Sequence, residues 1–306
     1  MPEIYPIGGG KGGVGKSFIA ASLGVMFANC GKKVVLVDLD LGASNLHTFL
    51  GIKNPKRGID SFLNKKVKKL EHVAFPTNVP DLFIISSLHC SIEIANLFYT
   101  QKQKIINAIR KLPFDYILLD LGSGTNFNTL DFFLTSNKGI LILTHEPTSV
   151  ENSFRFIKAV YLRKLKQIVK QHAFNFAVKN AAADPNNAVI KSHDIIKIVL
   201  KYDPDREKFL KEKLSELRFK FIINLFRKNL DPKLGEKIET VCNQHFYSNF
   251  QFLGNISYDE RIYDTVLLKK LFVLKYPYTA PSIDLKKIAD EITKVRKSAS
   301  LTSQIS

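Results

Sequence analysis

A glycine-rich stretch near the start of the 306-residue chain reads Gly8-Gly9-Gly10-Lys11-Gly12-Gly13-Val14-Gly15-Lys16-Ser17. From Gly10 onward this stretch matches the P-loop pattern G-x-x-x-x-G-K-[S/T], whose glycines let the backbone wrap closely around phosphate groups. An apolar run precedes it and apolar residues at helical spacing follow it, so the N-terminal end of a helix would face the phosphates. We therefore predict a nucleoside triphosphate site in which Lys16 contacts the β- and γ-phosphates and the Ser17 hydroxyl binds Mg²⁺.

Seven short apolar runs, with helical stretches between them, organise the rest of the chain. The central runs are apolar on both faces, which is typical of parallel strands covered by helices on both sides. The alternation predicts an α/β fold with a doubly wound, mostly parallel sheet. Pro6 lies in the first run, and we expect the strand to stop hydrogen-bonding there because proline lacks an N–H. The predicted strands are Ile4–Ile7, Val34–Asp38, Leu82–Ser86, Tyr116–Asp120, Ile140–Thr144, Phe219–Leu225 and Phe252–Ile256.

We predict a single domain over residues 1–297 and a flexible polar tail at 298–306. A further helix is expected at Asp284–Lys297. We favour packing of this helix on the domain over binding to a membrane, because its apolar face lacks Phe and Trp. A helical insertion at about 171–217 breaks the rhythm of strands and helices, and its last helix carries the apolar residues Phe209, Leu210, Leu214 and Leu217.

Acidic side chains stand at the ends of two predicted strands. Asp38 and Asp40 end one run, and the two-residue period of a strand points both to the same side. Asp120 ends another buried run, as is required of a Walker B carboxylate held near a metal ion. Ligands bind at the carboxyl ends of parallel strands, so these acids favour a ligand site over simple turn caps. Gly122 and Gly124 follow Asp120 and could let a backbone N–H approach the γ-phosphate.

The second lysine of the glycine loop, Lys11, is not needed by an ordinary P-loop. The segment Lys11–Ser17, Lys-Gly-Gly-Val-Gly-Lys-Ser, closely resembles the variant P-loop of the MinD/ParA family of ATPases, which includes the FlhG-type regulators of flagellar number and position. The resemblance covers about residues 1–165 and 218–295. It implies that Lys11 crosses a dimer interface to contact the ATP of a second subunit, so that two subunits enclose two nucleotides and separate on hydrolysis.

The same resemblance implies roles for residues outside the loop. Asp40 would orient the attacking water, and Asp38 would assist Mg²⁺ through bound water, next to the direct metal residues Ser17 and Asp120. Asn224, in Ile223-Asn224-Leu225-Phe226-Arg227, would lie against the adenine base. The full set of expected nucleotide contacts is Gly10, Lys11, Gly12, Gly13, Val14, Gly15, Lys16, Ser17, Phe18 and Asn224.

The net charge is +17, which fits attraction to a polyanion but also fits a composition that uses Lys heavily throughout. Arg163, Lys164, Lys166 and Lys170 could track phosphates along one helix, although a solvated helix face is favoured. The three cysteines are far apart and form no CxxC pair, so they do not indicate a metal site. We see no signal-peptide pattern and no apolar run of about 20 residues, and we expect a cytoplasmic protein.

The glycine loop predicts ATP and Mg²⁺ as cofactors, and the resemblance implies an ATPase with low turnover that works as a dimerisation switch of the MinD/FlhG type. Its partners would be a second copy of the chain and an unidentified activating protein. The surface on which it acts stays open between the inner face of the membrane, bound peripherally, and DNA, bound without sequence preference. The alternatives are a ParA-like DNA-partitioning ATPase and a metabolic or assembly enzyme of the same fold.

Overall fold

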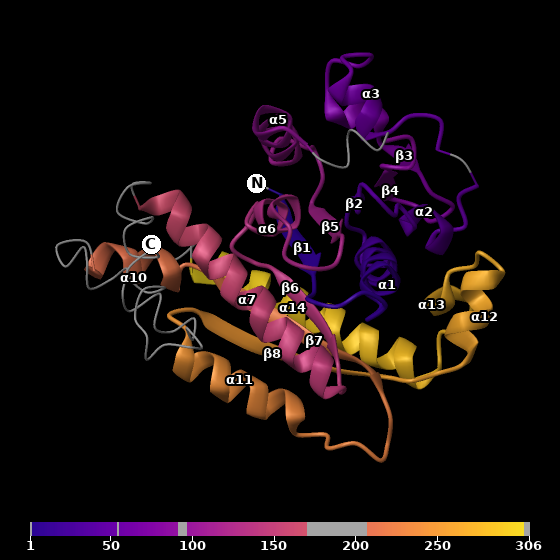
Figure 1. Ribbon diagram of the computed structural model, residues 1–306. Coiled ribbons are helices and arrows are strands. Elements are labelled where there is room, and N and C mark those ends of the chain that lie inside the picture. Colours follow the sequence, from indigo (N-terminus) through magenta and orange to yellow (C-terminus); the bar gives the residue numbers. More distant parts are fainter. Residues whose placement is uncertain (1, 54, 91–96, 170–206, 303–306) are drawn as a thin grey trace.

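Eight strands form one sheet at the centre of the computed structural model, in the order β3-β4-β2-β5-β1-β6-β7-β8 (Figure 1). The structure describes residues 2–53, 55–90, 97–169 and 207–302, and side chains up to Lys294 in the last helix. All neighbouring strands are parallel except β3 and β4. The strands are β1 Glu3–Gly8, β2 Val34–Leu39, β3 Phe75–Pro76, β4 Leu82–Ile85, β5 Tyr116–Leu121, β6 Ile140–Thr144, β7 Arg218–Phe226 and β8 Asn249–Ser257.

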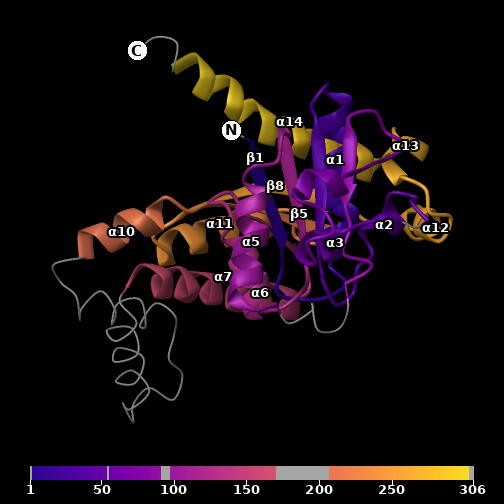
Figure 2. The same cartoon turned by 90° about the horizontal axis from the view of Figure 1, so that it is seen from above.

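Helices cover both faces of this sheet, and each face has its own apolar core. Alternate residues of a strand point to opposite faces, so Val35 and Val37 of β2 enter one core while Val34 and Leu36 enter the other. Figure 2 shows α1 and α14 on one side of the sheet and α6 and α7 on the other. The first core packs against α3 Ile59–Leu63, the 3-10 helix η1 Leu70–Val73, α5 Tyr99–Ile109, α6 Phe127–Phe133, α7 Pro147–Ile168, α10 Glu207–Ser215 and α11 Leu234–His245.

The second core packs against four helices: α1 Lys16–Asn29, α2 Leu46–Phe49, α13 Phe272–Lys275 and α14 Ala280–Thr302. A further helix, α12 Arg261–Leu267, comes just before α13 in the chain. Among the described residues, no helix combines the length and apolar character needed to cross a bilayer.

The predicted doubly wound, mostly parallel α/β fold is confirmed. All seven predicted runs form strands, and the sequence missed only the two-residue edge strand β3, where Pro76 is tolerated because an edge strand leaves one side unpaired. The expectation for Pro6 is wrong. The ladder between β1 and β5 continues through Pro6 to Ile7, and pairing with β6 starts at Ile7 and reaches Gly8. One missing donor is therefore absorbed within a strand that is paired on both sides.

The two predicted C-terminal features have different outcomes. Leu285, Ile288 and Ile292 are at most 1% exposed in α14, so this helix packs on the sheet as expected. The helix runs on to Thr302, past residue 298, where the sequence placed the start of the tail. The helix predicted around Phe209 forms as α10, with Leu210 and Leu214 buried, whereas the rest of the proposed insertion, residues 171–206, lies outside the described residues.

Candidate nucleotide-binding site

The glycine loop joins the central strand β1 to α1 and lies pressed against neighbouring elements. Gly15 has φ +91°, in the left-handed region that favours glycine, and a Cβ there would lie 2.3 Å from Asn224 Nδ2. A Cβ on Gly10 would lie 2.1 Å from the carbonyl oxygen of Asn152 in α7. Side chains are thus excluded at both positions by packing. The loop can therefore present its N–H groups, and the N-terminal end of α1, toward a bound anion.

Asn224, near the end of β7, holds the glycine loop through a hydrogen bond. Its Nδ2 donates to the carbonyl oxygen of Val14 at 2.9 Å, and the residue is 2% exposed. Its Oδ1 is buried with no hydrogen-bond partner among the described residues. A contact between Asn224 and an adenine base stays a prediction. The geometry shows a different contact, a tether that holds the P-loop to the sheet.

Asp120 lies under the loop at the end of β5, next to β1 in the sheet. It is 2% exposed, and its carboxylate accepts a hydrogen bond from the Ser17 hydroxyl. Asp120 Oδ1 is buried and has no hydrogen-bond partner in the described part of the chain. A buried carboxylate oxygen without a partner, beside a hydroxyl, is a donor set that suits a hard cation such as Mg²⁺.

The electrostatics around Asp120 also favour a bound cation. Asp38 on β2 is the register neighbour of Asp120 on β5, and both are fully buried. Burial, reinforced by the charge of Asp38, raises the pKa of Asp120 to about 8, although Ser17 and Lys16 act in the opposite direction. Burial likewise raises the pKa of Asp38 to about 6. Two adjacent buried carboxylates that resist ionisation are the arrangement that a divalent cation relieves.

The Lys16 side chain lies near the carboxylates of Asp120 and Asp40. Burial lowers the pKa of its ammonium, and the nearby charges of Asp120 and Asp40 partly restore it. Its Cδ lies 3.7 Å from the position that a Cβ on Gly9 would take, so the side chain curls back along the loop. The structure thus brings the predicted residues Lys16, Ser17, Asp40 and Asp120 together at one edge of the sheet, and we call this group the nucleotide corner.

Asp38 organises the segment that follows β2. Its Oδ1 accepts from the N–H of Asp40 at 3.1 Å, and its Oδ2 accepts from Ser44 Oγ at 2.6 Å and from the N–H of Leu46 at 3.3 Å. These bonds fold residues 40–46 over the strand end. A role for Asp38 toward Mg²⁺ stays a prediction, because both of its oxygens already accept bonds from this segment.

Asp40 lies between two loops that face the same space. Its Oδ1 lies 3.2 Å from where a Cβ on Gly122 would stand, so a side chain at Gly122 would press on this carboxylate. The N–H of Gly124, two residues on, donates to the carbonyl oxygen of Gly9 at 3.3 Å. The segment after β5 therefore contacts both the P-loop and Asp40, and its approach to a terminal phosphate stays a prediction.

Lys11 lies apart from these groups. Its Nζ forms an ion pair with Glu146, the residue before α7, and the two side chains are 38% and 59% exposed. The two lysines of the loop therefore have different environments. Lys16 is enclosed by the site's own carboxylates, whereas Lys11 is held at the rim by an exposed partner.

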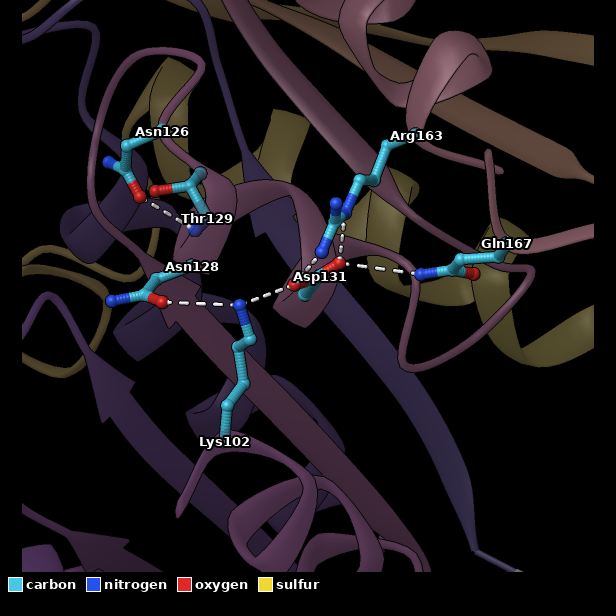
Figure 3. Close-up of polar contacts among 7 residues, drawn as sticks. All are labelled: Lys102, Asn126, Asn128, Thr129, Asp131, Arg163 and Gln167. Carbon is cyan, nitrogen blue, oxygen red and sulfur yellow. Dashed lines mark hydrogen bonds and ion pairs between the residues drawn. The ribbon is translucent and has the colours of Figure 1, made fainter. Parts of the chain in front are cut away.

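A buried network ties α5, α6 and α7 together behind the segment after β5 (Figure 3). Asp131 of α6 is 3% exposed and accepts from Arg163 Nε at 2.6 Å and Nη2 at 2.7 Å, and it pairs with Lys102 Nζ at 2.5 Å. Burial raises the pKa of Asp131, but the hydrogen bonds from Arg163 and Lys102 outweigh this and lower it. For Arg163, both the phosphate-tracking interpretation and the favoured solvated-face interpretation are therefore wrong, because its guanidinium pairs with the buried Asp131.

The sequence did not reveal Glu146, Asp131 or Lys102 as parts of this region. Lys11 and Glu146 are 135 residues apart, and Lys102 lies 29 positions before Asp131, so no spacing pattern links them. A lone acid at the start of a helix after a strand would have been the only available signal for Glu146. Among the described residues, no group of three or more His, Cys, Asp or Glu side chains could hold a metal ion. A cation here would thus depend on Ser17 and on ligand oxygens as well as Asp120.

The chain resembles known nucleotide-binding proteins over most of its length. A model of the CobQ/CobB/MinD/ParA nucleotide-binding domain matches residues 6–272. The septum site-determining protein MinD of Helicobacter pylori is 28% identical over 206 residues, which cover 65% of this chain and 75% of that protein. The antiactivator FleN of Pseudomonas aeruginosa is 26% identical over 159 residues, which cover 51% of this chain and 55% of that protein.

The fold is shared with a solved relative. The structure of MinD from Pyrococcus horikoshii, complexed with Mg-ADP, matches 97% of this chain and 98% of its own, with a TM-score of 0.66 at 20% sequence identity. At that identity the likeness establishes the fold. The chain spans 75% of the length of the Helicobacter relative and about half the length of the Pseudomonas one.

Proposed function

The chain belongs to the CobQ/CobB/MinD/ParA nucleotide-binding family, and we propose that it is an ATP-binding, slowly hydrolysing switch that dimerises around its nucleotide. In this proposal it positions or regulates a cellular machine, such as the flagellum, through an activating protein partner. The similarity to a septum site-determining protein and to an antiactivator supports this reading. The site geometry supports the ATPase part, since one corner holds a phosphate loop, a buried acid pair and the partly exposed carboxylate of Asp40.

Each residue of the corner has a distinct task. Magnesium, when bound, would neutralise charge on the phosphates, and Ser17 and Asp120 would hold it. Lys16 would contact the β- and γ-phosphates, replacing its long-range attraction to Asp120 and Asp40 with direct contacts. Asp40, the accessible carboxylate of the corner, would orient the attacking water. The N–H groups of the segment after Asp120, already bonded to Gly9 through Gly124, would read the terminal phosphate.

The observation that carries the switch is the position of Lys11. Its ammonium does not enter the corner of its own subunit but stands at the rim in an exposed ion pair with Glu146. Such pairs contribute only about 0–1 kcal/mol, so a triphosphate presented by a second subunit can replace Glu146 at small cost. A lysine that can exchange Glu146 for a phosphate in this way would bind the second subunit only when that subunit carries a triphosphate.

The test compares two variants that break the same ion pair. Lys11→Ala removes the lysine, whereas Glu146→Gln keeps it. We expect wild type and Glu146→Gln to elute as dimers with ATP and Mg²⁺ and as monomers with ADP, and Lys11→Ala to stay monomeric while it still binds a fluorescent ATP analogue. If wild type stays monomeric with ATP, the dimerisation proposal fails; if Lys11→Ala dimerises as wild type does, the role given to Lys11 fails.

A ParA-like partitioning ATPase is the second candidate, favoured by the net charge of +17 and by the family assignment. This function requires ATP-dependent binding to DNA without sequence preference. Co-sedimentation with duplex DNA and, separately, with anionic vesicles, each with ATP and with ADP, distinguishes the two candidates. Pelleting with vesicles alone supports the membrane-bound switch, and pelleting with DNA alone supports partitioning.

A further inference from the structure

A lysine-rimmed hollow lies far along α5 from the nucleotide corner, between α5 and the segment that contains α3 and η1. Its volume is about 530 Å³. Apolar side chains form its floor, among them Phe62, Leu70 and Leu112. Four lysines stand around it, and we call them the lysine rim: Lys68, Lys69, Lys104 and Lys111.

The segment that borders the hollow is unusually basic. Seven of the 19 residues from 53 to 71 are Lys or Arg, against 45 of 306 in the whole chain, and only Asp60 and Glu71 are acidic. Composition bias alone does not account for this local density. In the described part of the chain, Lys69 is the one lysine of the rim with a carboxylate partner, Glu71 Oε1 at 3.2 Å. The rim therefore carries a clear excess of positive charge.

Lys104 is a rim lysine whose side chain is held in place by a neighbouring residue. Its Nζ donates to the carbonyl oxygen of Phe62 at 3.0 Å and lies 4.5 Å from the centre of the Phe62 ring. This links α5 to the end of α3 across the hollow. A second hollow of about 530 Å³ is lined by three basic residues, Lys56, Arg57 and Lys66, and one acid, Asp60, together with Ser61 and His89. A ligand that spans both hollows would meet basic side chains in each.

The shape of the site decides among anionic ligands. A phosphodiester backbone needs positive charge but has no apolar group to place on an apolar floor. A membrane-binding surface projects bulky apolar side chains outward, whereas this surface is concave and its apolar residues line the bottom. An apolar side chain must therefore come from the partner and be flanked by negative charges that meet the lysines. An acidic protein segment with an apolar side chain has this chemistry.

The geometry points to the lysine rim and its hollow as a docking site for an acidic segment of another protein, anchored by an apolar side chain. The glutamates or aspartates of the segment pair with the lysine rim, and its leucine or phenylalanine enters between Phe62 and Leu112. No nucleotide group takes part. The site thus goes beyond the proposed ATP switch and can be tested on the chain without nucleotide.

The experiment measures fluorescence anisotropy of two labelled peptides in about 50 mM salt, where screening is weak. One peptide consists of glutamates around a central Leu-Phe pair, and the other of glutamates alone. We expect the first to bind more tightly to wild type. Charge reversal at the rim, Lys68→Glu with Lys111→Glu, should weaken its binding by about tenfold or more. The matched control, Lys228→Glu with Lys270→Glu, changes the net charge equally at exposed lysines elsewhere and should leave binding within about twofold.

A second variant tests the hollow without changing charge. Ala108 lies on α5 at the wall of the hollow, and Ala108→Phe should fill it. We expect this variant to bind both peptides equally, because only the apolar anchor loses its place. Equal binding of the two peptides to wild type would overturn the proposal, as would equal weakening by the rim and control pairs. Tighter binding of duplex DNA or of phosphatidylglycerol vesicles than of the Leu-Phe peptide, lost in the rim variant, would overturn the class of partner.

Discussion

Replacing Asp120 with asparagine should stabilise the chain in the absence of nucleotide and Mg²⁺, although it removes a residue expected to hold the metal. Asp120 is fully buried beside Asp38, and no cation of the described residues pairs with it directly. Its pKa is raised to about 8, chiefly by burial and then by the charge of Asp38. The folded protein therefore carries a proton here at neutral pH that the unfolded chain does not.

The size of the effect follows from this proton. Holding it at pH 7 against an ordinary pKa of 3.8 costs up to about 4 kcal/mol, at about 1.36 kcal/mol for each pKa unit. Water that enters the loop relaxes part of this cost, so we expect Asp120→Asn to raise the free energy of unfolding by about 2 kcal/mol. Asparagine keeps an oxygen that can accept the hydrogen bond from Ser17.

The matched control is Asp131→Asn, at a second buried aspartate with the opposite surroundings. Asp131 pairs with Arg163 and Lys102, and its pKa is lowered. Removing its charge leaves two cations without a counterion in the interior, which should lower the free energy of unfolding by about 3 kcal/mol. Urea unfolding of both variants and wild type at pH 7, without ligand, measures the two opposite signs.

The dependence on pH gives a separate check on Asp120. Between pH 4 and pH 8 the folded state holds the proton and the unfolded state does not, so the contribution of Asp120 to the stability of wild type falls as pH rises. The advantage of Asp120→Asn should be absent near pH 4, grow with pH, and level off above pH 8. A loss of stability in Asp120→Asn similar to that in Asp131→Asn would refute the view that the acid pair is strained without a cation.

Two further predictions concern the support of the glycine loop. Asn224→Ala removes the bond to Val14 and leaves that carbonyl oxygen unpaired, so we expect a loss of about 1 kcal/mol in unfolding experiments and weaker binding of a fluorescent ATP analogue by calorimetry or anisotropy. Gly15→Ala should be far worse than Gly13→Ala. Both have positive φ, but a Cβ at Gly15 meets Asn224 at 2.3 Å while the space around Gly13 is open, so thermal melts should show a backbone cost of about 1 kcal/mol at Gly13 and a larger loss at Gly15. Equal melting temperatures for these two variants would contradict the packing argument.

The nucleotide corner could be predicted from the sequence because each of its parts lies in a short, continuous motif. Lys16 and Ser17 belong to a continuous glycine motif after the first strand, the acids stand at or just after the ends of two other strands, and parallel strands carry their C-terminal ends to one edge. The register that sets Asp38 beside Asp120 is therefore implied once the strands are correctly assigned. The same logic located Asn224 near the end of β7, where its amide donates to Val14, while a contact with adenine stays a prediction.

What the sequence could not predict depends on contacts between helices. Asp131, Lys102 and Arg163 come from three different helices, and each looks like an ordinary member of an amphipathic pattern. Arg163 even looked like part of a basic, solvated face. Helical periodicity tells which side of a helix is apolar but not which charged side chains meet when three helices pack together. Such pairs become visible only when the packing is known.

The contrast between Lys11 and Lys16 bears on how the site can work as a switch. Lys16 is half-buried beside two carboxylates, and burial lowers its pKa, so its charge is satisfied fully only when an anion fills the loop. Lys11 is already satisfied by Glu146, but in an exposed pair that is easily exchanged. In the proposed switch, an anion in the loop would therefore stabilise Lys16 within one subunit. Dimerisation, as proposed, would depend on the smaller difference between two partners of Lys11. A small difference of this kind can be reversed by the loss of one phosphate, whereas a buried pair such as Arg163–Asp131 could not.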